Sequence, residues 1–512
     1  MTHSQLRDHS FLGVTQSICP ECVQVVPAKI IARDGRVYFR KQCPEHGLRD
    51  DFVCSDEKWF DRSGNRAPGR RPPVMGVEPN RGCPYDCGLC TEHEQHTCVA
   101  VLEITSSCNL SCPLCYASSG PGGKHVPLED CLRAIDRLVE CEGRAEILQL
   151  SGGEPTIHPQ FLEIFEYACS RPIDVVMINT NGIRLARDKA FRQAIAKLKH
   201  RSEIYLQFDG FNDDANLVLR GEPLLETKLR AIDALGEEGI RATLVCTLER
   251  DLNLDQVGRI IEFGIERPWV TGVVFQPATY VGRYMLPEQL ERRVTFPDVI
   301  RAIGEQSNVW RESDFLPLPC AHPNTHTLAY AYRHEGRAVP LTRFLDIENN
   351  LDLLANGITF NRTAAQKLIG EFLSRSACGG DEACGCGPVL PPIASPTSKP
   401  GFLPIVELST LSSPSATSDD LVKQAGESFF RRAMALDLSP ADVFRITITS
   451  FMDAFNFDIR ALMKSCVHHL LPSGHLVPFC AYNLLYRDGR VPLPPLTGVA
   501  PQRRPREVVE LS

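Results

Sequence analysis

The chain has 512 residues and a formal net charge of −8, with 43% apolar and 23% charged residues. This balance is typical of a globular protein, and mild acidity without a long basic run argues against a dedicated nucleic-acid binder. No run of about 18 apolar residues predicts a membrane-spanning helix, and residues 1–16 lack the apolar core of a signal peptide. We therefore expect a cytoplasmic protein, in which clustered cysteines, drawn from 21 in all, are metal ligands rather than disulfides.

The pattern of residues 1–61 predicts a small β unit that binds one metal ion. Two strand-like runs are joined by Asp34-Gly35, a strong signal for a hairpin turn. Two ligand pairs with the spacing of metal knuckles flank the hairpin: Cys19, Cys22, Cys43 and His46. Four such ligands suit a tetrahedral Zn²⁺ or a single iron, and the spacing does not select the metal. Cys54 is an alternative fourth ligand, in which case His46 is only a turn residue.

Residues 62–98 form an auxiliary segment, in which an Arg- and Pro-rich linker precedes a second group of cysteines. A C-x3-C-x2-C run and one later thiolate make up this group: Cys83, Cys87, Cys90 and Cys98. Four thiolates saturate a [4Fe–4S] cube, so we expect a cluster for electron transfer or for the substrate side of the site. His93 and His96 are interpreted as loop residues or hydrogen-bond donors rather than as ligands.

Residues 99–285 alternate short apolar runs with amphipathic segments. The expected strands lie at 99–105, 146–150, 174–179, 203–207, 241–247 and 271–276. The expected helices lie at 128–140, 159–169, 188–198, 223–237 and 254–264. Such alternation predicts an α/β fold with a parallel sheet, either open or curled into a partial (β/α)6 barrel. In such barrels the functional residues gather at the carboxyl ends of the strands.

A second C-x3-C-x2-C run follows the first expected barrel strand directly: Cys108, Cys112 and Cys115. Three thiolates at this spacing hold three irons of a [4Fe–4S] cube and leave the fourth iron open to a small molecule. The next strand ends in Leu150-Ser-Gly-Gly-Glu-Pro155. Gly152 and Gly153 allow backbone to approach a ligand closely, and Glu154 is placed to accept an ammonium group.

The cysteine triplet followed by Gly-Gly-Glu-Pro on a βα series resembles the radical SAM superfamily over residues 95–285. The resemblance implies that the open iron binds the amine and carboxylate of S-adenosylmethionine (SAM). Electron transfer from the cluster would then release a 5′-deoxyadenosyl radical, which abstracts an unactivated hydrogen from the substrate. The strand-end residues implied to contact SAM are Gly152, Gly153, Glu154, Pro155, Asn179, Thr180, Asn181, Gln207, Asp209 and Gln276. For each of the residues after Pro155, a capping or turn role is an equal alternative.

The alternation weakens after residue 285. An extension at 286–386 is expected to carry helices near 287–306, 345–355 and 363–375. A Pro-, Ser- and Thr-rich stretch at 387–419 is interpreted as a disordered insertion. A C-terminal auxiliary-cluster domain with a tail, at 420–512, is expected to be helical at 420–470 and to form strand and turn at 475–485.

Six late cysteines are candidates for a third cluster: Cys320, Cys378, Cys384, Cys386, Cys466 and Cys480. We expect four of the six to hold a [4Fe–4S] cube. Cys320, Cys466 and Cys480 are favoured because they flank otherwise ordered segments, and the alternative is that some of the six are free. Four further cysteines lie on expected helices or strands and are interpreted as packing residues: Cys131, Cys141, Cys169 and Cys246.

The order of segments resembles a narrower branch, the archaeal tetraether lipid synthase and its relatives, which include a dihydropterin C-methyltransferase. The matching parts are the N-terminal ligand unit, the string from Gly82 to Cys98, Cys466-Val-His-His and Pro478-Phe-Cys-Ala-Tyr-Asn483. The resemblance implies radical C–H functionalisation, in first place carbon–carbon coupling of lipid-like alkyl chains. The alternative is C-methylation of a pterin or another ring compound. A third hypothesis, of another class, is a non-catalytic iron–sulfur electron carrier.

A lipid substrate requires an apolar groove. Candidates to line it are Phe451, Phe455, Phe457, Ile459 and Leu462, with a helix core as the alternative interpretation. The expected cofactors are a SAM-binding [4Fe–4S] cluster, one or two auxiliary [4Fe–4S] clusters and one Fe or Zn ion. The expected partners are a small-molecule or lipid substrate and a low-potential electron donor of the ferredoxin or flavodoxin type. A nucleic-acid partner is not expected, and transient contact with a membrane is compatible with the sequence.

Overall fold

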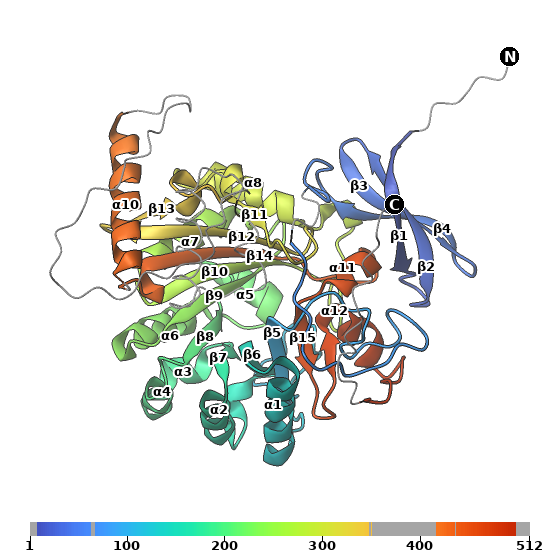
Figure 1. Cartoon of the computed structure of the whole chain (residues 1–512), viewed down its shortest axis with the longest axis horizontal. Coiled ribbons are helices and arrows are strands. Elements are labelled where there is room, and N and C mark those ends of the chain that lie inside the picture. Colours follow the sequence, from blue (N-terminus) through green and yellow to red (C-terminus); the bar gives the residue numbers. More distant parts are fainter. Residues whose placement is uncertain (1–7, 63–66, 348–349, 351–415, 436, 498–512) are drawn as a thin grey trace, which may run out of the picture.

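The computed structural model describes residues 8–62, 67–347, 350, 416–435 and 437–497. These residues form a small antiparallel sheet at the N-terminus and a large, mostly parallel sheet (Figure 1). The predicted α/β class with an N-terminal metal-binding unit is confirmed. None of the described helices has the length and apolar character needed to cross a bilayer.

The N-terminal sheet is a meander in which each strand is antiparallel to the next. Its strands are β1 (Ser10–Ile18), β2 (Val25–Arg33), β3 (Arg36–Cys43) and β4 (Gly47–Cys54). The predicted turn at Asp34-Gly35 is confirmed, and both residues adopt the positive φ that a two-residue hairpin turn requires. The sequence pattern does not predict β1 or β4. β4 is obscured because charged residues interrupt its apolar pattern; one of them, Asp50, pairs with Arg40 on β3.

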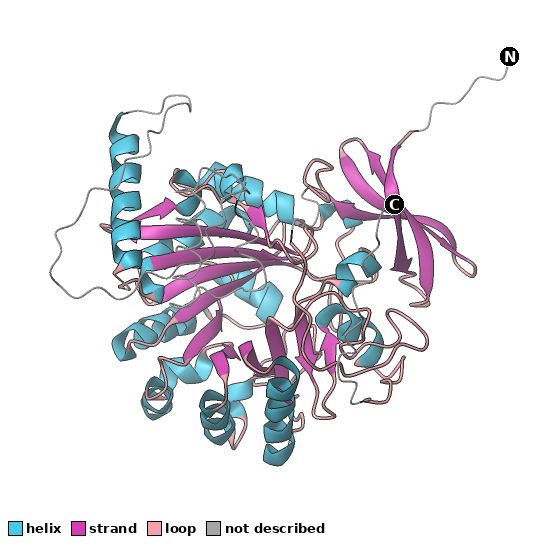
Figure 2. Cartoon of the chain, in the orientation of Figure 1, coloured by secondary structure: helices cyan, strands magenta, loops and turns pink. Residues whose placement is uncertain are grey.

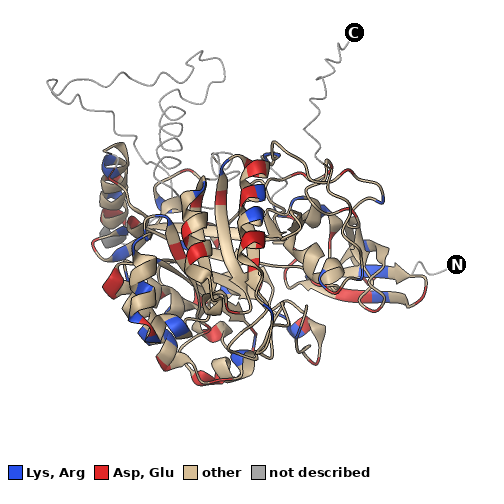
Figure 3. Ribbon diagram, turned by 90° about the horizontal axis from the view of Figure 1, so that it is seen from below, with Lys and Arg blue, Asp and Glu red and all other residues tan. Residues whose placement is uncertain are grey.

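The large sheet contains the six predicted βα units in the predicted order. Its parallel strands are β5 (Val99–Thr105), β6 (Ala145–Gly152), β7 (Ile173–Thr180), β8 (Ser202–Gln207), β9 (Ala242–Leu248) and β10 (Val270–Pro277). The connecting helices are α1 (Leu128–Glu142), α2 (Phe161–Ser170), α3 (Ile183–Arg187), α4 (Lys189–Ala196), α5 (Asp213–Arg220), α6 (Leu225–Glu238) and α7 (Val257–Ile265). Most of them pack on the outer face of the curved sheet (Figure 2). Acidic and basic residues are interspersed along them (Figure 3).

The C-terminal part of the chain extends the parallel sheet on both sides. β14 (Val443–Thr449) pairs in parallel with β10, and β15 (Val467–Leu470) pairs in parallel with β5. The prediction that residues 420–470 are helical is therefore wrong for these strands. Among the described residues of this stretch, α-helix is confined to α10 (Ala416–Met434) and α11 (Ile459–Met463). The overlooked signal is the alternation of β14, whose Phe444, Ile446 and Ile448 are buried.

The remaining elements complete the sheet edges. β11 (Leu316–Pro317), β12 (His326–His334) and β13 (Arg337–Pro340) are antiparallel, and β12 pairs with β14. The helix expected at 287–306 begins later, as α8 (Phe296–Gln306), because Thr295 and Asp298 form a capping box there. In the segment 475–485, β16 (Leu476–Pro478) confirms the strand, but α12 (Phe479–Ala481) and a π-helical turn (Tyr482–Tyr486) replace the expected turn.

Some predictions concern residues outside the described part of the chain. They include the helix at 363–375, most of the insertion at 387–419, the tail after 497 and three late cysteines: Cys378, Cys384 and Cys386. Of the helix expected at 345–355, residues 345–347 are described and are not helical, whereas residue 350 has 3-10 helical backbone. Residues 416–419 of the insertion expected to be disordered belong to α10 instead.

Candidate cluster and cofactor site

The interior of the barrel holds a cavity of about 260 Å³. The predicted residues that line it are Cys108, Cys112, Cys115, Gly152, Gly153, Glu154, Asn179, Thr180, Asn181, Gln207 and Gln276. They come from the loop after β5 and from the carboxyl ends of β6, β7, β8 and β10, as the barrel rule predicts. Three converging thiols beside several amide groups fit an iron–sulfur cluster with a polar ligand.

The cysteine loop lies directly on the two glycines that end β6. Gly152 has a φ of 128°, and a Cβ atom there would clash with the carbonyl oxygen of Thr105. A Cβ on Gly153 would clash with the carbonyl of Ser107 and lie 3.0 Å from the Cβ of Cys108. The Gly153 amide also donates to the Thr105 carbonyl at 2.7 Å. The glycines therefore allow close approach of the cysteine loop itself, rather than only of a ligand as the sequence suggests.

Glu154 is buried, and its carboxylate is engaged within the protein. Oε1 accepts hydrogen bonds from the Thr156 amide at 3.1 Å and the Thr180 hydroxyl at 2.7 Å. Oε2 accepts from the Asn181 amide at 2.8 Å. Burial nonetheless raises the pKa of this carboxyl above its ordinary value. The carboxylate thus joins the turn after β7 to the turn after β6. This structural role is additional to the predicted one, in which Glu154 accepts an ammonium group. Pro155 starts a 3-10 turn and does not line the cavity.

Asp209 does not line the cavity but holds a cation that does. Its carboxylate accepts two hydrogen bonds of 2.8 Å from Arg220, and the Arg220 interactions lower its pKa against the opposing effect of burial. Burial lowers the pKa of the neighbouring Lys228 to about 8, and its Nζ donates to the Gln207 carbonyl at 2.7 Å. Burial also raises the pKa of the Cys112 thiol, and Arg220 and Lys228 oppose that rise. The two cations suit a thiolate-bound, negatively charged group.

A second anchor of the cysteine loop is absent from the sequence interpretation. Arg283 and Cys115 exchange backbone hydrogen bonds of 2.9 and 3.0 Å. The Arg283 side chain donates to the carbonyls of Cys112 at 3.0 Å and Ser119 at 2.6 Å. No sequence pattern marks this arginine for such a role. The neighbouring Gly282 is the detectable hint of close packing, and the structure explains it, because a Cβ there would clash with the Tyr116 carbonyl.

The four N-terminal ligands come together as predicted. The ligand atoms of Cys19, Cys22, Cys43 and His46 all lie within 4.8 Å of one another. Sγ of Cys43 lies 3.5 Å from Nδ1 of His46. Cys54 is not part of this group: its buried thiol donates to the Asp56 carbonyl at 3.4 Å, and burial raises its pKa to about 12. The donor set of three sulfurs and one imidazole fits a tetrahedral metal ion.

The structure brings Cys98 close to a late cysteine, a contact that the sequence interpretation does not include. Cys87 interacts electrostatically with Cys83 and Cys90, as expected for one cluster. Cys98, however, lies beside Cys466: the amide of Cys98 donates to the Cys466 carbonyl at 2.9 Å, and the hydrogen bond between the two thiols raises the pKa of Cys98. The parallel pairing of β5 with β15 causes this arrangement, and no motif predicts that pairing.

The late cysteines Cys320, Cys466 and Cys480 lie in one buried apolar cluster together with Cys98. Sγ of Cys480 accepts a hydrogen bond from the Met452 amide at 3.2 Å. His326, which the sequence interpretation missed, hydrogen-bonds to Cys466 and also lines the cavity. Of this group only His326 lines the cavity, and three of the cysteines adjoin lining residues in the chain: Val99, Val467 and Phe479. The cysteines expected to be packing residues, Cys131, Cys141, Cys169 and Cys246, lie in the hydrophobic core.

Gly152→Ala tests whether the close packing of the cysteine loop on the end of β6 is needed to bind the cluster. The added methyl group cannot coexist with the Thr105 carbonyl, and φ is positive, so we expect the variant to lose the iron bound at Cys108, Cys112 and Cys115, about four atoms per chain. Iron analysis and electron paramagnetic resonance (EPR) of the reconstituted protein measure this loss. Gly304→Ala is the matched control because nothing lies within 4 Å of its Cβ position. Full iron content in Gly152→Ala would contradict the assignment.

The N-terminal ligand set is tested by comparing His46→Ala with Cys54→Ala. We expect His46→Ala to weaken metal retention because it removes one of four grouped ligands. Cys54→Ala leaves that group intact and should retain the metal. Metal content after dialysis, measured by mass spectrometry, separates the two, and retention by His46→Ala with loss in Cys54→Ala would reverse the assignment.

Two family models match the chain. The radical SAM superfamily matches residues 102–264, and the HMPTM N-terminal zinc ribbon domain matches residues 11–55. Among solved structures, that of Streptococcus suis SuiB bound to S-adenosylmethionine is similar with a TM-score of 0.35 and 17% identity, over 40% of this chain and 46% of that one.

One sequence relative extends the similarity to nearly the whole chain. A 7,8-dihydro-6-hydroxymethylpterin dimethyltransferase of Methanocaldococcus jannaschii is 31% identical over 505 residues, which cover 93% of this chain and 94% of the relative. The mycofactocin maturase MftC of Mycolicibacterium smegmatis is 28% identical over 156 residues, 30% of this chain and 38% of the relative. The chain therefore belongs to the family of the M. jannaschii protein within the radical SAM superfamily, and it is an enzyme that uses a [4Fe–4S] cluster and SAM.

Proposed function

We propose that this radical SAM enzyme is a C-methyltransferase that acts on a pterin or a closely related ring compound. The observation that carries the proposal is the similarity over nearly the full length to the M. jannaschii pterin dimethyltransferase. The similarity includes the zinc ribbon as well as the barrel. It favours the ring-compound alternative over the first expectation from the sequence, the coupling of lipid-like alkyl chains.

The chemistry of the cavity supports a ring with polar edges. Its lining includes the carboxamides of Gln149, Asn179, Gln207 and Gln276. Tyr205 accepts a hydrogen bond of 3.1 Å from Gln276 within the cavity wall. Carboxamides offer both donors and acceptors, and a fused nitrogen heterocycle presents both along its edge. Each of these carboxamides has one partner within the protein. An alkyl chain in the same place would leave their further donors and acceptors without partners, at a cost in free energy.

The residues proposed to form an apolar groove do not support a lipid site. Of the five, only Phe451 lines the cavity. Phe457, Ile459 and Leu462 are buried in the apolar cluster around Cys466. Phe455 packs against Tyr280, with ring centroids 6.5 Å apart. These side chains fill space between elements instead of lining an open groove.

The protein's own residues would hold the cofactor and exclude water. The bound cluster with SAM supplies a 5′-deoxyadenosyl radical when reduced, which is chemistry of the cofactor rather than of side chains. Cys108, Cys112 and Cys115 are proposed as the cluster ligands. Asn179, Asn181 and the other strand-end amides in the cavity are proposed to orient SAM and the substrate. A low-potential ferredoxin or flavodoxin is the proposed electron donor.

The proposal is tested by turnover. Reduced, reconstituted protein is incubated with ¹³C-methyl SAM and 7,8-dihydro-6-hydroxymethylpterin, with and without a cell extract that supplies other one-carbon donors. We expect 5′-deoxyadenosine and a pterin heavier by one or two methyl groups, whose ¹³C content identifies the donor. The Cys112→Ala variant is the control and should form neither product. Formation of 5′-deoxyadenosine with unchanged pterin in both arms would contradict the proposal, and coupled chains from an added lipid would restore the alternative.

We further propose two auxiliary clusters with a revised division of ligands. Cys98, Cys320, Cys466 and Cys480 would hold one [4Fe–4S] cube beside the cavity, and Cys83, Cys87 and Cys90 would bind the other. The support is the contact of Cys98 with Cys466 and its electrostatic interaction with Cys320, whereas Cys87 interacts with Cys83 and Cys90. The apolar cluster that holds the first set also contains Cys87 and therefore does not separate the two sets. This replaces both a closed cube containing Cys83 and Cys98 and a third cube from late cysteines alone.

The division predicts which variants share a defect. Cys98→Ser and Cys466→Ser should remove the same EPR signal and about four irons, because both change one cluster. Cys90→Ser should remove a different signal. If Cys98→Ser instead removes the signal that Cys90→Ser removes, the division predicted from the spacing is correct and the revised one is wrong.

A further inference from the structure

The zinc ribbon packs against a loop that forms part of the cavity wall. This loop, residues 450–458, follows β14 and is called the wall loop here. Phe451 lines the cavity, as does Thr449 just before the loop. The ribbon strands lie at the side of the barrel next to α11, which directly follows the wall loop (Figure 1). The ribbon therefore contacts a loop that also carries a cavity-lining residue, Phe451.

Lys41 on β3 makes the central contact. Its side chain is fully buried. Nζ donates to the carbonyls of Ala454 at 2.7 Å and Phe455 at 2.8 Å, both in the wall loop. It also donates to the carbonyl of Ile18 in the ribbon at 3.0 Å and pairs with Asp51 at 2.9 Å. One ammonium group thus joins three carbonyls and a carboxylate across the junction, so every donor of the buried cation has a partner.

Two hydroxyl groups of β1 bind the other end of the wall loop. The Ser17 hydroxyl donates to the Phe457 carbonyl at 2.5 Å. The Thr15 hydroxyl donates to Oδ1 of Asp458 at 2.6 Å. The ribbon therefore grips the wall loop at two places, through Lys41 in its middle and through β1 at its end.

The far side of the wall loop is fixed to the barrel. Asp453 accepts hydrogen bonds from the buried Arg293 at 2.6 Å and from the Tyr280 amide at 3.2 Å. Phe451 packs on Phe479 with ring centroids 4.2 Å apart. Phe479 belongs to α12, next to Cys480. Movement of the loop would therefore move the Phe451 ring.

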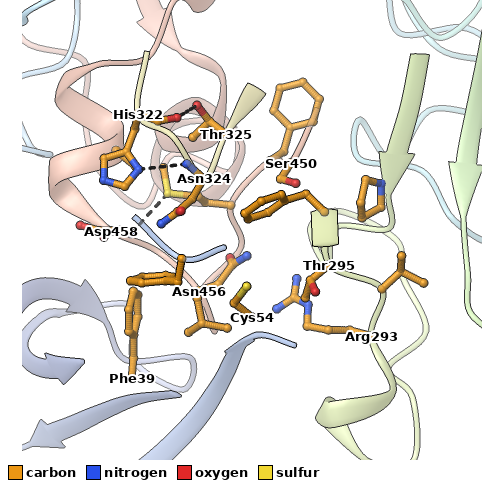
Figure 4. Close-up of a pocket in the computed structure, with 18 of the residues that line it drawn as sticks. Phe39, Cys54, Arg293, Thr295, His322, Asn324, Thr325, Ser450, Asn456 and Asp458 are labelled. Atoms are coloured by element: carbon orange, nitrogen blue, oxygen red, sulfur yellow. Dashed lines mark hydrogen bonds between the residues drawn. The ribbon is translucent and has the colours of Figure 1, made fainter. Parts of the chain in front are cut away.

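A smaller cavity of about 50 Å³ lies at the ribbon–barrel junction (Figure 4). Phe39 and Cys54 contribute from the ribbon, and Asn456 and Asp458 from the wall loop. Phe451 lines both cavities, together with Pro277 and Ala278. A shift of the Phe451 ring would therefore change the shape of both cavities.

We propose that Lys41 is a positioning residue, through which the metal-binding ribbon sets Phe451 and so the fit of the substrate in the cavity. Lys41 lies two residues before Cys43, and the Ile18 carbonyl that it binds precedes Cys19. Lys41 on β3 and the Ile18 carbonyl on β1 therefore both lie close to ligands of the ribbon metal site. The substrate part of this inference rests on the proposed pterin methyltransferase function.

The test compares Lys41→Met with Lys29→Met in the full-length, cluster-loaded protein. Methionine fills a similar volume without the ammonium group, and Asp51 keeps Arg49 as a partner at 2.8 Å. Lys29 is exposed on β2 and serves as the matched control. Hydrogen–deuterium exchange reports on peptide 450–458. Titration with SAM and with 7,8-dihydro-6-hydroxymethylpterin reports on the cavity, and ribbon metal content reports on ribbon folding.

We expect Lys41→Met to accelerate exchange of peptide 450–458 and to weaken pterin binding about tenfold, the effect of losing roughly one or two hydrogen bonds. SAM affinity should stay within about twofold, because Lys41 hydrogen-bonds to the wall loop and to Ile18 and not to the cysteine loop. Lys29→Met should change none of these quantities. Unchanged exchange, or equal loss of SAM and pterin affinity, would overturn the proposal.

A milder variant and a substrate-free readout separate the remaining outcomes. Ser17→Ala removes one hydrogen bond between the ribbon and the wall loop and should accelerate exchange of peptide 450–458 less than Lys41→Met does. If Lys41→Met loses the ribbon metal, the exchange of Ser17→Ala shows whether the ribbon contacts hold the wall loop. If wild-type protein cleaves SAM but does not bind pterin, the proposed function fails. Exchange of peptide 450–458 then still decides whether Lys41 holds the wall loop: faster exchange supports the clamp, and unchanged exchange refutes it.

Discussion

Close backbone packing between the loop after β5 and the end of β6 is the constraint on which the site depends. The Thr105 and Ser107 carbonyls occupy the space where side chains at positions 152 and 153 would lie. Only glycine fits there, and its fit holds Cys108 beside the barrel axis. Glu154 then ties the same turn to the end of β7 through the Asn181 amide. The cysteine loop, the strand ends and the cavity are thus fixed as one unit.

The C-terminal strands turn this half-barrel into an enclosed site. β14 contributes Arg445, Thr447 and Thr449 to the cavity wall, while its alternate residues enter the core. β15 pairs with β5 and brings Cys466 beside Cys98. The wall loop that joins β14 to α11 carries the contacts with the zinc ribbon. Residues of the barrel, of the extension after it and of the C-terminal strands therefore line one cavity.

Local patterns predict the barrel and the ribbon well because their signals are local. Alternating βα units and knuckle spacing depend on neighbouring residues, and the ligands Cys19 and His46 lie 27 positions apart on one small sheet. The division of the other cysteines depends on which distant strands pair, so spacing placed Cys98 with Cys90 although β15 brings it to Cys466. Asp209 illustrates a second limit: a polar strand-end residue was predicted to meet the cofactor, but it binds Arg220. The helical interpretation of 420–470 failed because it overlooked the alternation of β14, in which Phe444, Ile446 and Ile448 are buried.

The central claim is that the barrel cavity, whose mainly apolar lining carries several carboxamides, receives a pterin-like ring rather than an alkyl chain. Calorimetric titration of the anaerobic, SAM-loaded protein with 7,8-dihydro-6-hydroxymethylpterin, and separately with a detergent-dispersed alkyl lipid, tests it most directly. The account predicts saturable binding of one pterin per chain and no saturable binding of the lipid. Saturable lipid binding without pterin binding would contradict it.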